Sequence, residues 1–91
     1  LRNIVKTLSI LIPVFNEEAT LITLLDMVHN ADSLGLQKEL IIVDDGSTDN
    51  TRAILGELDT AKYNAKIYYH EKNQGKGAAL RTAQGYAEGD L

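Results

Sequence analysis

Residues 38–45 (KELIIVDD), followed at once by GSTDNT at residues 46–51, decide the fold of this 91-residue chain. Short, continuous aliphatic runs of this kind are typical of strands that are covered on both faces of a parallel sheet. The glycine, serine, threonine and aspartate residues that follow suit a sharp turn and the cap of a helix. The stretch therefore predicts a buried central strand whose carboxyl end carries two adjacent carboxylates.

The same order of strand and helix recurs on both sides of this stretch. Residues 7–14 (TLSILIPV) form a second aliphatic run, and residues 66–70 (KIYYH) form a weaker third one. Alternating strands and helices predict a three-layer, doubly wound α/β fold with a mostly parallel, Rossmann-like sheet. We expect the strand order 3-2-1, with the first two helices on one face and the third on the other. A fourth strand should begin where the chain reaches residues 89–91 (GDL).

Three helices are predicted between and after the strands. The first spans residues 17 to about 34, with Asn16 as its N-cap and Gly35 just after its end. The second begins near residues 48–49, and the third spans residues 77 to about 87. The residues expected to face the sheet are Leu21, Leu24, Leu25 and Val28 in the first helix, Thr51, Ile54, Leu55 and Leu58 in the second, and Ala79, Leu80, Ala83 and Tyr86 in the third.

The length of the chain, 91 residues, indicates one small domain. Its residues are 44% hydrophobic and include no cysteine, which excludes a disulfide framework, a thiolate zinc site and a cysteine nucleophile. The net charge of −4 argues against a general nucleic-acid binder. The longest apolar stretch, residues 8–15, is too short to span a membrane. Because the chain begins with Leu1 rather than methionine, we expect it to be a piece of a longer protein.

The three segments that follow the strands are the candidate site, because ligands of a doubly wound sheet bind beyond the carboxyl ends of its strands. After the first strand come Pro13, Phe15 and Glu17, which offer a strand stop, a flat apolar ring and a carboxylate. The alternative is that this segment is only a capped turn whose phenylalanine belongs to the core.

Two adjacent carboxylates, Asp44 and Asp45, end the second strand and are followed by Gly46. Because side chains alternate between the faces of a strand, we expect the two acids to have different roles. One would accept hydrogen bonds from a ribose or base in the crevice, and the other would bond amides of the turn. The alternative is that both acids only stabilise the turn.

The segment after the third strand, NQGKGAALR at residues 73–81, places Gly75, Lys76 and Arg81 near a helix N-terminus. Free amides and a basic side chain at such a position can bind a phosphate. The pattern is not a P-loop, which needs serine or threonine after the lysine, and it is not a dinucleotide-binding fingerprint, which would follow the first strand. The alternative is a simple glycine-rich helix start.

Taken together and in this order, IPVFNEE, VDDGSTDNT and NQGKGAALR resemble the N-terminal part of a family 2 glycosyltransferase, especially of the dolichyl- and polyprenyl-phosphate sugar synthase branch. The resemblance covers nearly the whole chain. It implies a nucleotide-sugar-binding domain of the GT-A type in an inverting enzyme, which transfers a sugar from a nucleoside diphosphate to an acceptor. The donor would be a UDP- or GDP-sugar, and the acceptor of that branch is a polyprenyl phosphate.

The resemblance also implies roles for the candidate residues. Asp45 matches the carboxylate that contacts the base or ribose, and Asp44 and Gly46 would shape the turn beside it. The positions that line the nucleoside pocket are matched by Pro13, Phe15 and Glu17. The segment beside the donor diphosphate is matched by Gly75, Lys76 and Arg81.

The parts of the family pattern that perform the reaction would lie beyond Leu91. The metal-binding Asp-x-Asp motif follows the fourth strand, and the catalytic base lies further along. We therefore expect Mg²⁺ or Mn²⁺ in the full-length parent, no metal and no catalytic residue within residues 1–91, and a chain that is inactive alone. Enzymes of this branch act at the cytoplasmic membrane face, so a cytoplasmic location is expected. Without a fourth strand, the apolar edge of the first strand would be open to self-association.

Two other functions are compatible with the sequence. A nucleotidyltransferase of related architecture would carry a glycine-rich, basic signature directly after its first strand, where this chain has FNEE. A non-catalytic nucleotide-binding or interaction module of the same fold would lack two carboxylates soon after Leu91.

Overall fold

The computed structural model describes residues 6–91, and its sheet consists of three parallel strands in the order β1-β2-β3. The strands are β1 (Thr7–Val14), β2 (Gln37–Asp45) and β3 (Ala65–His70). The central strand, β2, pairs with β1 from Thr7 opposite Gln37 to Val14 opposite Asp44. The predicted α/β fold with a parallel sheet in this order is therefore confirmed.

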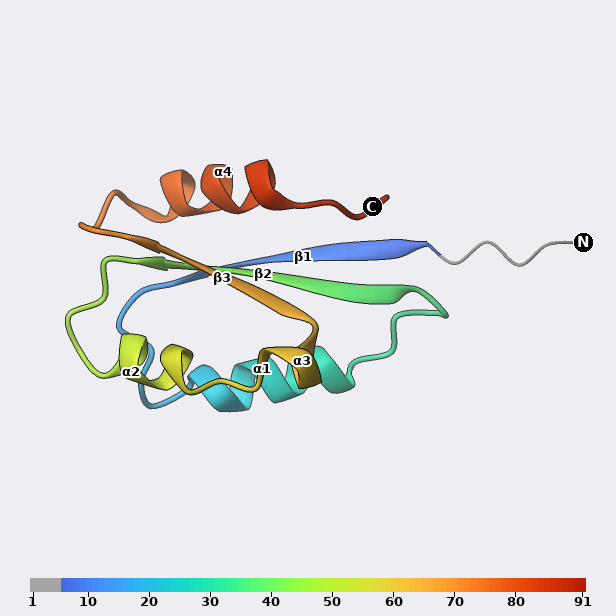
Figure 1. Cartoon of the computed structure of the whole chain (residues 1–91), viewed down its shortest axis with the longest axis horizontal. Helices are drawn as coiled ribbons and strands as arrows, with labels where there is room; N and C mark the ends of the chain where they lie inside the picture. The colour runs from blue at the N-terminus through green and yellow to red at the C-terminus, as the bar shows by residue number, and fades with distance from the viewer. Residues whose placement is uncertain (1–5) are drawn as a thin grey trace, which may run out of the picture.

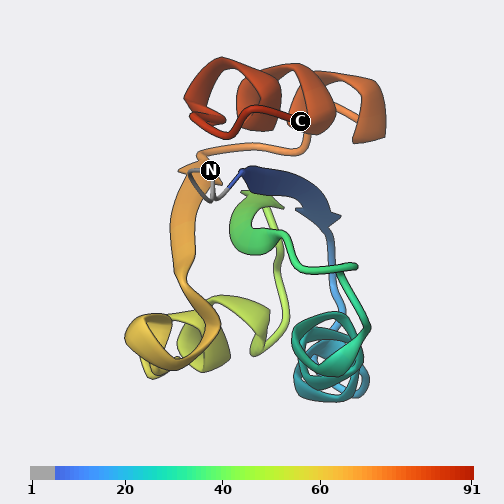
Figure 2. The same cartoon turned by 90° about the vertical axis from the view of Figure 1, so that its right-hand side faces the viewer.

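Helices cover both faces of the sheet and complete three layers (Figure 1 and Figure 2). On one face lie α1 (Leu21–Asn30), α2 (Thr51–Gly56) and α3 (Thr60–Tyr63). On the other face lies α4 (Lys76–Tyr86), which follows β3. The expected division of the helices between the two faces is confirmed.

The central strand separates two apolar clusters, because its side chains alternate between the faces. Both clusters include β2 residues that are completely buried. The small side chains on α4 let that helix lie close to the sheet. The cluster on the α1 side contains Leu21, Leu25, Leu40, Ile42 and Leu55, and the cluster on the α4 side contains Ile41, Val43, Ala79 and Ala83.

The first helix, α1, begins later than predicted, because the loop that follows β2 holds the residues just before it. Asn16 is not its N-cap: Asn16 has a φ of +49°, and its Oδ1 atom accepts hydrogen bonds from the amides of Thr48 and Asp49. The N-cap position is Thr20 instead. A contact over more than thirty residues therefore replaces the predicted local cap.

The first helix also ends earlier than predicted, at Asn30 rather than near residue 34. The ammonium group of Lys38 donates hydrogen bonds to the carbonyl oxygens of Val28, at 2.8 Å, and His29, at 2.9 Å. This lysine thus satisfies carbonyls of the last turn, which have no partner within the helix. Gly35 has a φ of +84°, but it lies in the loop before β2 and not at the helix end.

The second predicted helix is two short helices. α2 begins after its N-cap residue, Asn50, and ends at Gly56, and α3 follows after a short turn. Thr51 and Leu55 are buried on the inner side of α2, as predicted. The third predicted helix matches α4 within one residue at each end. Among residues 6–91, no helix is long and apolar enough to cross a membrane.

The outer edge of β1 is covered along its first half. The Leu91 amide donates a hydrogen bond to the Thr7 carbonyl at 3.1 Å, and the Leu91 carbonyl accepts one from the Ser9 amide at 2.8 Å, which is the parallel pattern. The expectation of a wholly open edge is therefore wrong for this half. The second half borders an apolar groove lined by Ile10, Leu11, Ile12, Pro13, Leu24, Val28, Lys76 and Leu80.

Two residues that were expected to face the sheet are substantially exposed. Leu24 of α1 is 40% exposed because it lies beside this groove. Tyr86 of α4 is 47% exposed, and its ring stacks on that of Tyr68 in β3 with the ring centroids 3.6 Å apart. Tyr86 therefore faces the sheet as predicted, and Leu24 lies along β1, but both side chains stay partly exposed because they lie at the margins of the sheet rather than over its centre.

Candidate functional site

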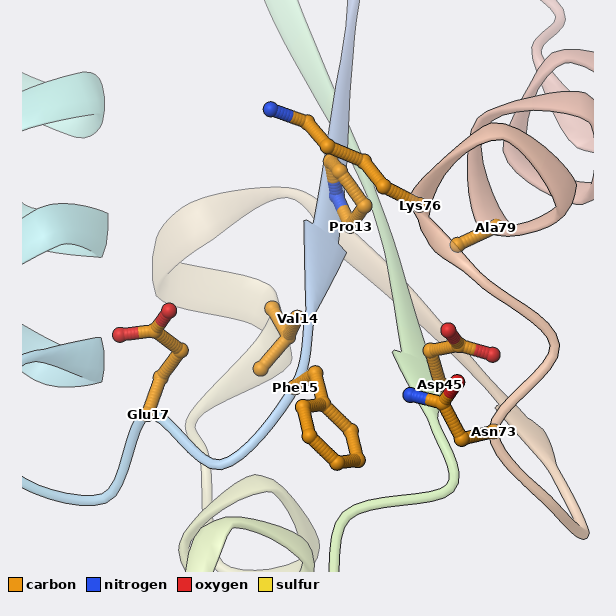
Figure 3. A pocket seen from close by; sticks show the side chains of 8 residues that line it. All are labelled: Pro13, Val14, Phe15, Glu17, Asp45, Asn73, Lys76 and Ala79. Carbon is orange, nitrogen blue, oxygen red and sulfur yellow. The ribbon is translucent and has the colours of Figure 1, made fainter.

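The carboxyl ends of the strands surround a cavity of about 280 Å³. Its walls come from the end of β1, the end of β2 and the segment that joins β3 to α4 (Figure 3). Phe15, Asp45 and Lys76, which are far apart in the sequence, therefore meet at one rim. The lining residues are Pro13, Val14, Phe15, Glu17, Asp45, Asn73, Lys76 and Ala79.

The end of β1 supplies an apolar wall. Phe15 is 42% exposed and lines the cavity, so its ring is not part of either apolar cluster. Glu17 is tied to its own surroundings: its amide donates a hydrogen bond to Thr51 Oγ1 at 2.8 Å, and its carboxylate accepts one from the Thr20 hydroxyl at 2.7 Å. In the view of Figure 3, Glu17 and Asp45 lie on opposite sides of β1.

Asp45 forms the acidic wall and also holds the neighbouring loop. Its Oδ1 atom accepts a hydrogen bond from the Gln74 amide and its Oδ2 atom accepts one from the Gly75 amide, each at 2.8 Å. The His70 ring lies 2.8 Å from Oδ1 through its Nδ1 atom. Burial alone would raise the pKa of Asp45, but the hydrogen bonds from His70 and the two amides outweigh it and hold the pKa below its ordinary value. Asp45 is therefore ionised at neutral pH.

Asp44 points to the opposite face and does not line the cavity. It is completely buried, and its Oδ2 atom accepts hydrogen bonds from Arg52 Nε at 2.8 Å and from the Ser47 amide at 3.1 Å. Arg52 also donates a hydrogen bond to the His70 carbonyl, so one guanidinium joins the ends of β2 and β3. The two adjacent carboxylates thus have the different surroundings that alternation along a strand predicts.

Gly46 lets the turn after β2 touch the loop after β3. Its φ is +74°, a conformation that favours glycine. A Cβ atom at this position would lie 2.4 Å from the Asn73 backbone nitrogen and 2.5 Å from the Lys72 carbonyl carbon. Only a residue without a side chain fits there.

The basic residues of the third segment are divided between the cavity and the outer surface. Gly75 is the N-cap residue of α4 with a φ of +99°, and Lys76, the first helical residue, lines the cavity. In Figure 3 the Lys76 side chain passes over Pro13 of β1, and its nitrogen lies on the far side of that strand from Asp45. Arg81 is exposed, and its guanidinium lies over Gly77 rather than in the cavity.

Sequence reasoning missed His70 and Arg52. His70 is the last residue of the strand predicted at residues 66–70, for which no role was expected, but it is buried and contacts Asp45. The signal that could have found it is strand register, because Asp45 and His70 end adjacent parallel strands and are directly paired. Arg52 is the only basic residue in α2. A buried carboxylate directly after an apolar strand run, as Asp44 is, needs a cation nearby.

The chemistry available at this rim is two carboxylates, a side-chain amide, a lysine, an aromatic ring and the N-terminus of an eleven-residue helix. Within residues 6–91, no three histidine, cysteine, aspartate or glutamate side chains come close enough together to hold a metal ion. The aromatic ring, the lysine and the helix N-terminus suit a planar ring and an anionic group.

Comparison with known proteins agrees with this geometry. The model of the family described as Glycosyl transferase family 2 matches residues 9–91. The crystal structure of S. aureus TarS 1-349 has a TM-score of 0.76 and 31% sequence identity, over 93% of this chain and 25% of that one. A second crystal structure of S. aureus TarS has a TM-score of 0.75 and 31% identity, over 93% of this chain and 15% of that one. The chain thus spans a quarter or less of the length of these structures. Since the family match extends over most of its residues, the chain belongs to glycosyl transferase family 2.

Proposed function

We propose that this chain forms the part of a glycosyltransferase that binds the nucleotide of a nucleotide-sugar donor. The observation that carries the proposal is the meeting of Phe15, Asp45 and Lys76 around one cavity at the carboxyl ends of the strands. Membership of glycosyl transferase family 2 supports it, because that family implies a sugar donor and an acceptor.

Each wall of the cavity has a role in this proposal. The Phe15 ring offers a flat apolar face to a nucleobase. Asp45 Oδ2 receives one hydrogen bond, from the Gly75 amide, so it can still accept one from a base N–H or a ribose hydroxyl. Lys76 and the N-terminus of α4 face the diphosphate. Arg81 would reach that group only after its side chain has moved from over Gly77.

The size of the cavity indicates which part of the donor it takes. Ligand pockets usually measure about 300–1,000 Å³, and this cavity, at about 280 Å³, lies just below that range. The cavity therefore suits the nucleoside, while the sugar and the acceptor would bind residues of the larger protein. We place Mg²⁺ or Mn²⁺ there as well, and we infer that the 91-residue chain is inactive alone.

Our proposal for the class of donor and for the acceptor rests on the resemblance to the polyprenyl-phosphate sugar synthase branch. On that basis the donor is a UDP- or GDP-sugar and the acceptor is a polyprenyl phosphate. The larger protein would then act at the cytoplasmic face of a membrane, where such a lipid presents its phosphate.

The Asp45→Asn substitution tests the nucleotide site. Asparagine keeps the size of the side chain but loses the charge and one acceptor, so the affinity for UDP or GDP should fall about tenfold. Calorimetric titration of the 91-residue chain with each nucleotide measures this. Glu57→Gln is the matched control, because it removes one negative charge from an exposed position outside the cavity. Equal affinity of Asp45→Asn and the parent chain would remove Asp45 from the site.

We also propose that a second copy of the chain covers the open half of the β1 edge. The groove beside this half is apolar, and Leu24 on its wall is 40% exposed. Replacing Leu24 by lysine should therefore abolish a dimer seen by sedimentation at high concentration. Leu34→Lys is the control, since Leu34 is 87% exposed and does not line the groove. A parent chain that sediments as a monomer at all concentrations would refute this association.

A further inference from the structure

His70 is a buried histidine with a specific partner on each ring nitrogen. It is the last residue of β3, and its side chain is 9% exposed. Its Nδ1 atom lies 2.8 Å from Asp45 Oδ1, and its Nε2 atom lies 2.8 Å from Thr82 Oγ1 on α4. The ring therefore connects β2, β3 and α4 without lining the cavity.

The direction of these hydrogen bonds is fixed by Asp45. The pKa of this carboxyl lies below its ordinary value, so the group is an ionised acceptor and the Nδ1 atom of His70 must carry a proton. In a neutral imidazole, Nε2 is then an acceptor, and the Thr82 hydroxyl donates to it. Asp45 thus selects the tautomer, and the Thr82 hydroxyl, which can donate or accept, fixes the ring orientation by donating to Nε2.

The same carboxylate holds the loop that forms the opposite wall. Oδ1 accepts hydrogen bonds from both His70 and the Gln74 amide, and Oδ2 accepts one from the Gly75 amide. Gly75 is the N-cap residue of α4, and Lys76 follows it directly. The plane of the Asp45 carboxylate therefore determines where the free lone pair of Oδ2 points and where α4 begins.

We propose that His70 is a positioning residue of the nucleotide site, which orients Asp45 through Nδ1 and is itself oriented by Thr82. This inference rests on the proposed nucleotide-binding function. His70 does not touch the ligand, and its contribution passes through Asp45 and the loop that Asp45 holds.

Two substitutions of His70 separate its two hydrogen bonds. The side-chain nitrogen of asparagine lies close to where Nδ1 lies in histidine, and that of glutamine lies close to where Nε2 lies. His70→Asn should therefore keep the bond to Asp45 and lose the bond to Thr82, whereas His70→Gln should do the reverse. We expect the affinity for UDP or GDP to fall about tenfold in His70→Gln and only about twofold in His70→Asn. Equal losses in the two variants, or no loss in either, would overturn the proposal.

A second measurement is independent of nucleotide binding. The amide protons of Gln74 and Gly75 donate to the carboxylate that His70 orients, so their NMR chemical shifts and exchange rates report its position. We expect both amides to shift upfield and exchange faster in His70→Gln than in His70→Asn, with Thr82→Val intermediate. If the parent chain binds neither nucleotide, the proposed function fails for this chain, while the amides still decide the role of His70. Unchanged amides in His70→Gln would refute that role.

Discussion

Replacing Gly46 by alanine is expected to destabilise the chain by about 3 kcal/mol. Two costs add at this position. An L-amino acid is disfavoured at a φ of +74°, and the new Cβ atom would lie 2.4 Å from the backbone nitrogen of Asn73. Since backbone atoms of the β3–α4 loop cannot rotate away as a side chain does, the loop itself must move. Urea unfolding followed by circular dichroism measures the loss.

Gly35→Ala is the matched control for this experiment. Gly35 has a φ of +84°, close to that of Gly46, but a Cβ atom there would meet nothing within 4 Å. Its substitution should therefore cost only the conformational strain, about 1 kcal/mol. Equal losses in the two alanine variants would show that the close approach of Gly46 to Asn73 does not exist in solution.

Replacing Arg52 by methionine should destabilise the chain by about 2 kcal/mol. Arg52 is the charged partner of Asp44, whose side chain is completely buried, and removing one partner of such a pair leaves an uncompensated charge in the interior. We expect less than the full cost of about 3–5 kcal/mol for a buried pair, because the Arg52 side chain is itself 39% exposed. Methionine retains an unbranched apolar stem, so packing changes little.

The exposed ion pair between Lys62 and Asp26 supplies the control. Its charged atoms are 3.8 Å apart, and the side chains are 53% and 44% exposed. Lys62→Met should therefore change the free energy of unfolding by less than about 1 kcal/mol. Adding Asp44→Asn to Arg52→Met should recover part of the loss, because the buried charge is then gone. No recovery in the double variant would refute the ionic explanation.

The strands were predictable because their signal is local. The aliphatic runs at residues 7–14 and 38–45 can be buried only in the middle of a layered structure, and they define β1 and β2 almost to the residue. The opposite orientations of Asp44 and Asp45 also follow from the pleat of one strand. The family could then be predicted because the three motifs that follow the strands occur in a recognisable order along the chain.

The helix start and the supporting residues of the site were not predictable in the same way. Asn16 has the right chemistry for an N-cap, but Thr48 and Asp49 take its side-chain oxygen, and neither is near it in the sequence. His70 likewise depends on the register between β2 and β3, which no local pattern contains. These features arise only when distant segments are brought together.

The parallel pairing has a consequence for the route by which the chain folds. Ser9 and Glu39, on neighbouring strands, are 30 positions apart, and Asp45 and His70 are 25 positions apart. No hairpin can start the sheet, so each strand pair must first close a long loop and lose the corresponding chain entropy. Folding should therefore be slower than in a helical bundle of this length. Neither the β1–β2 pair nor the β2–β3 pair should be stable without the third strand.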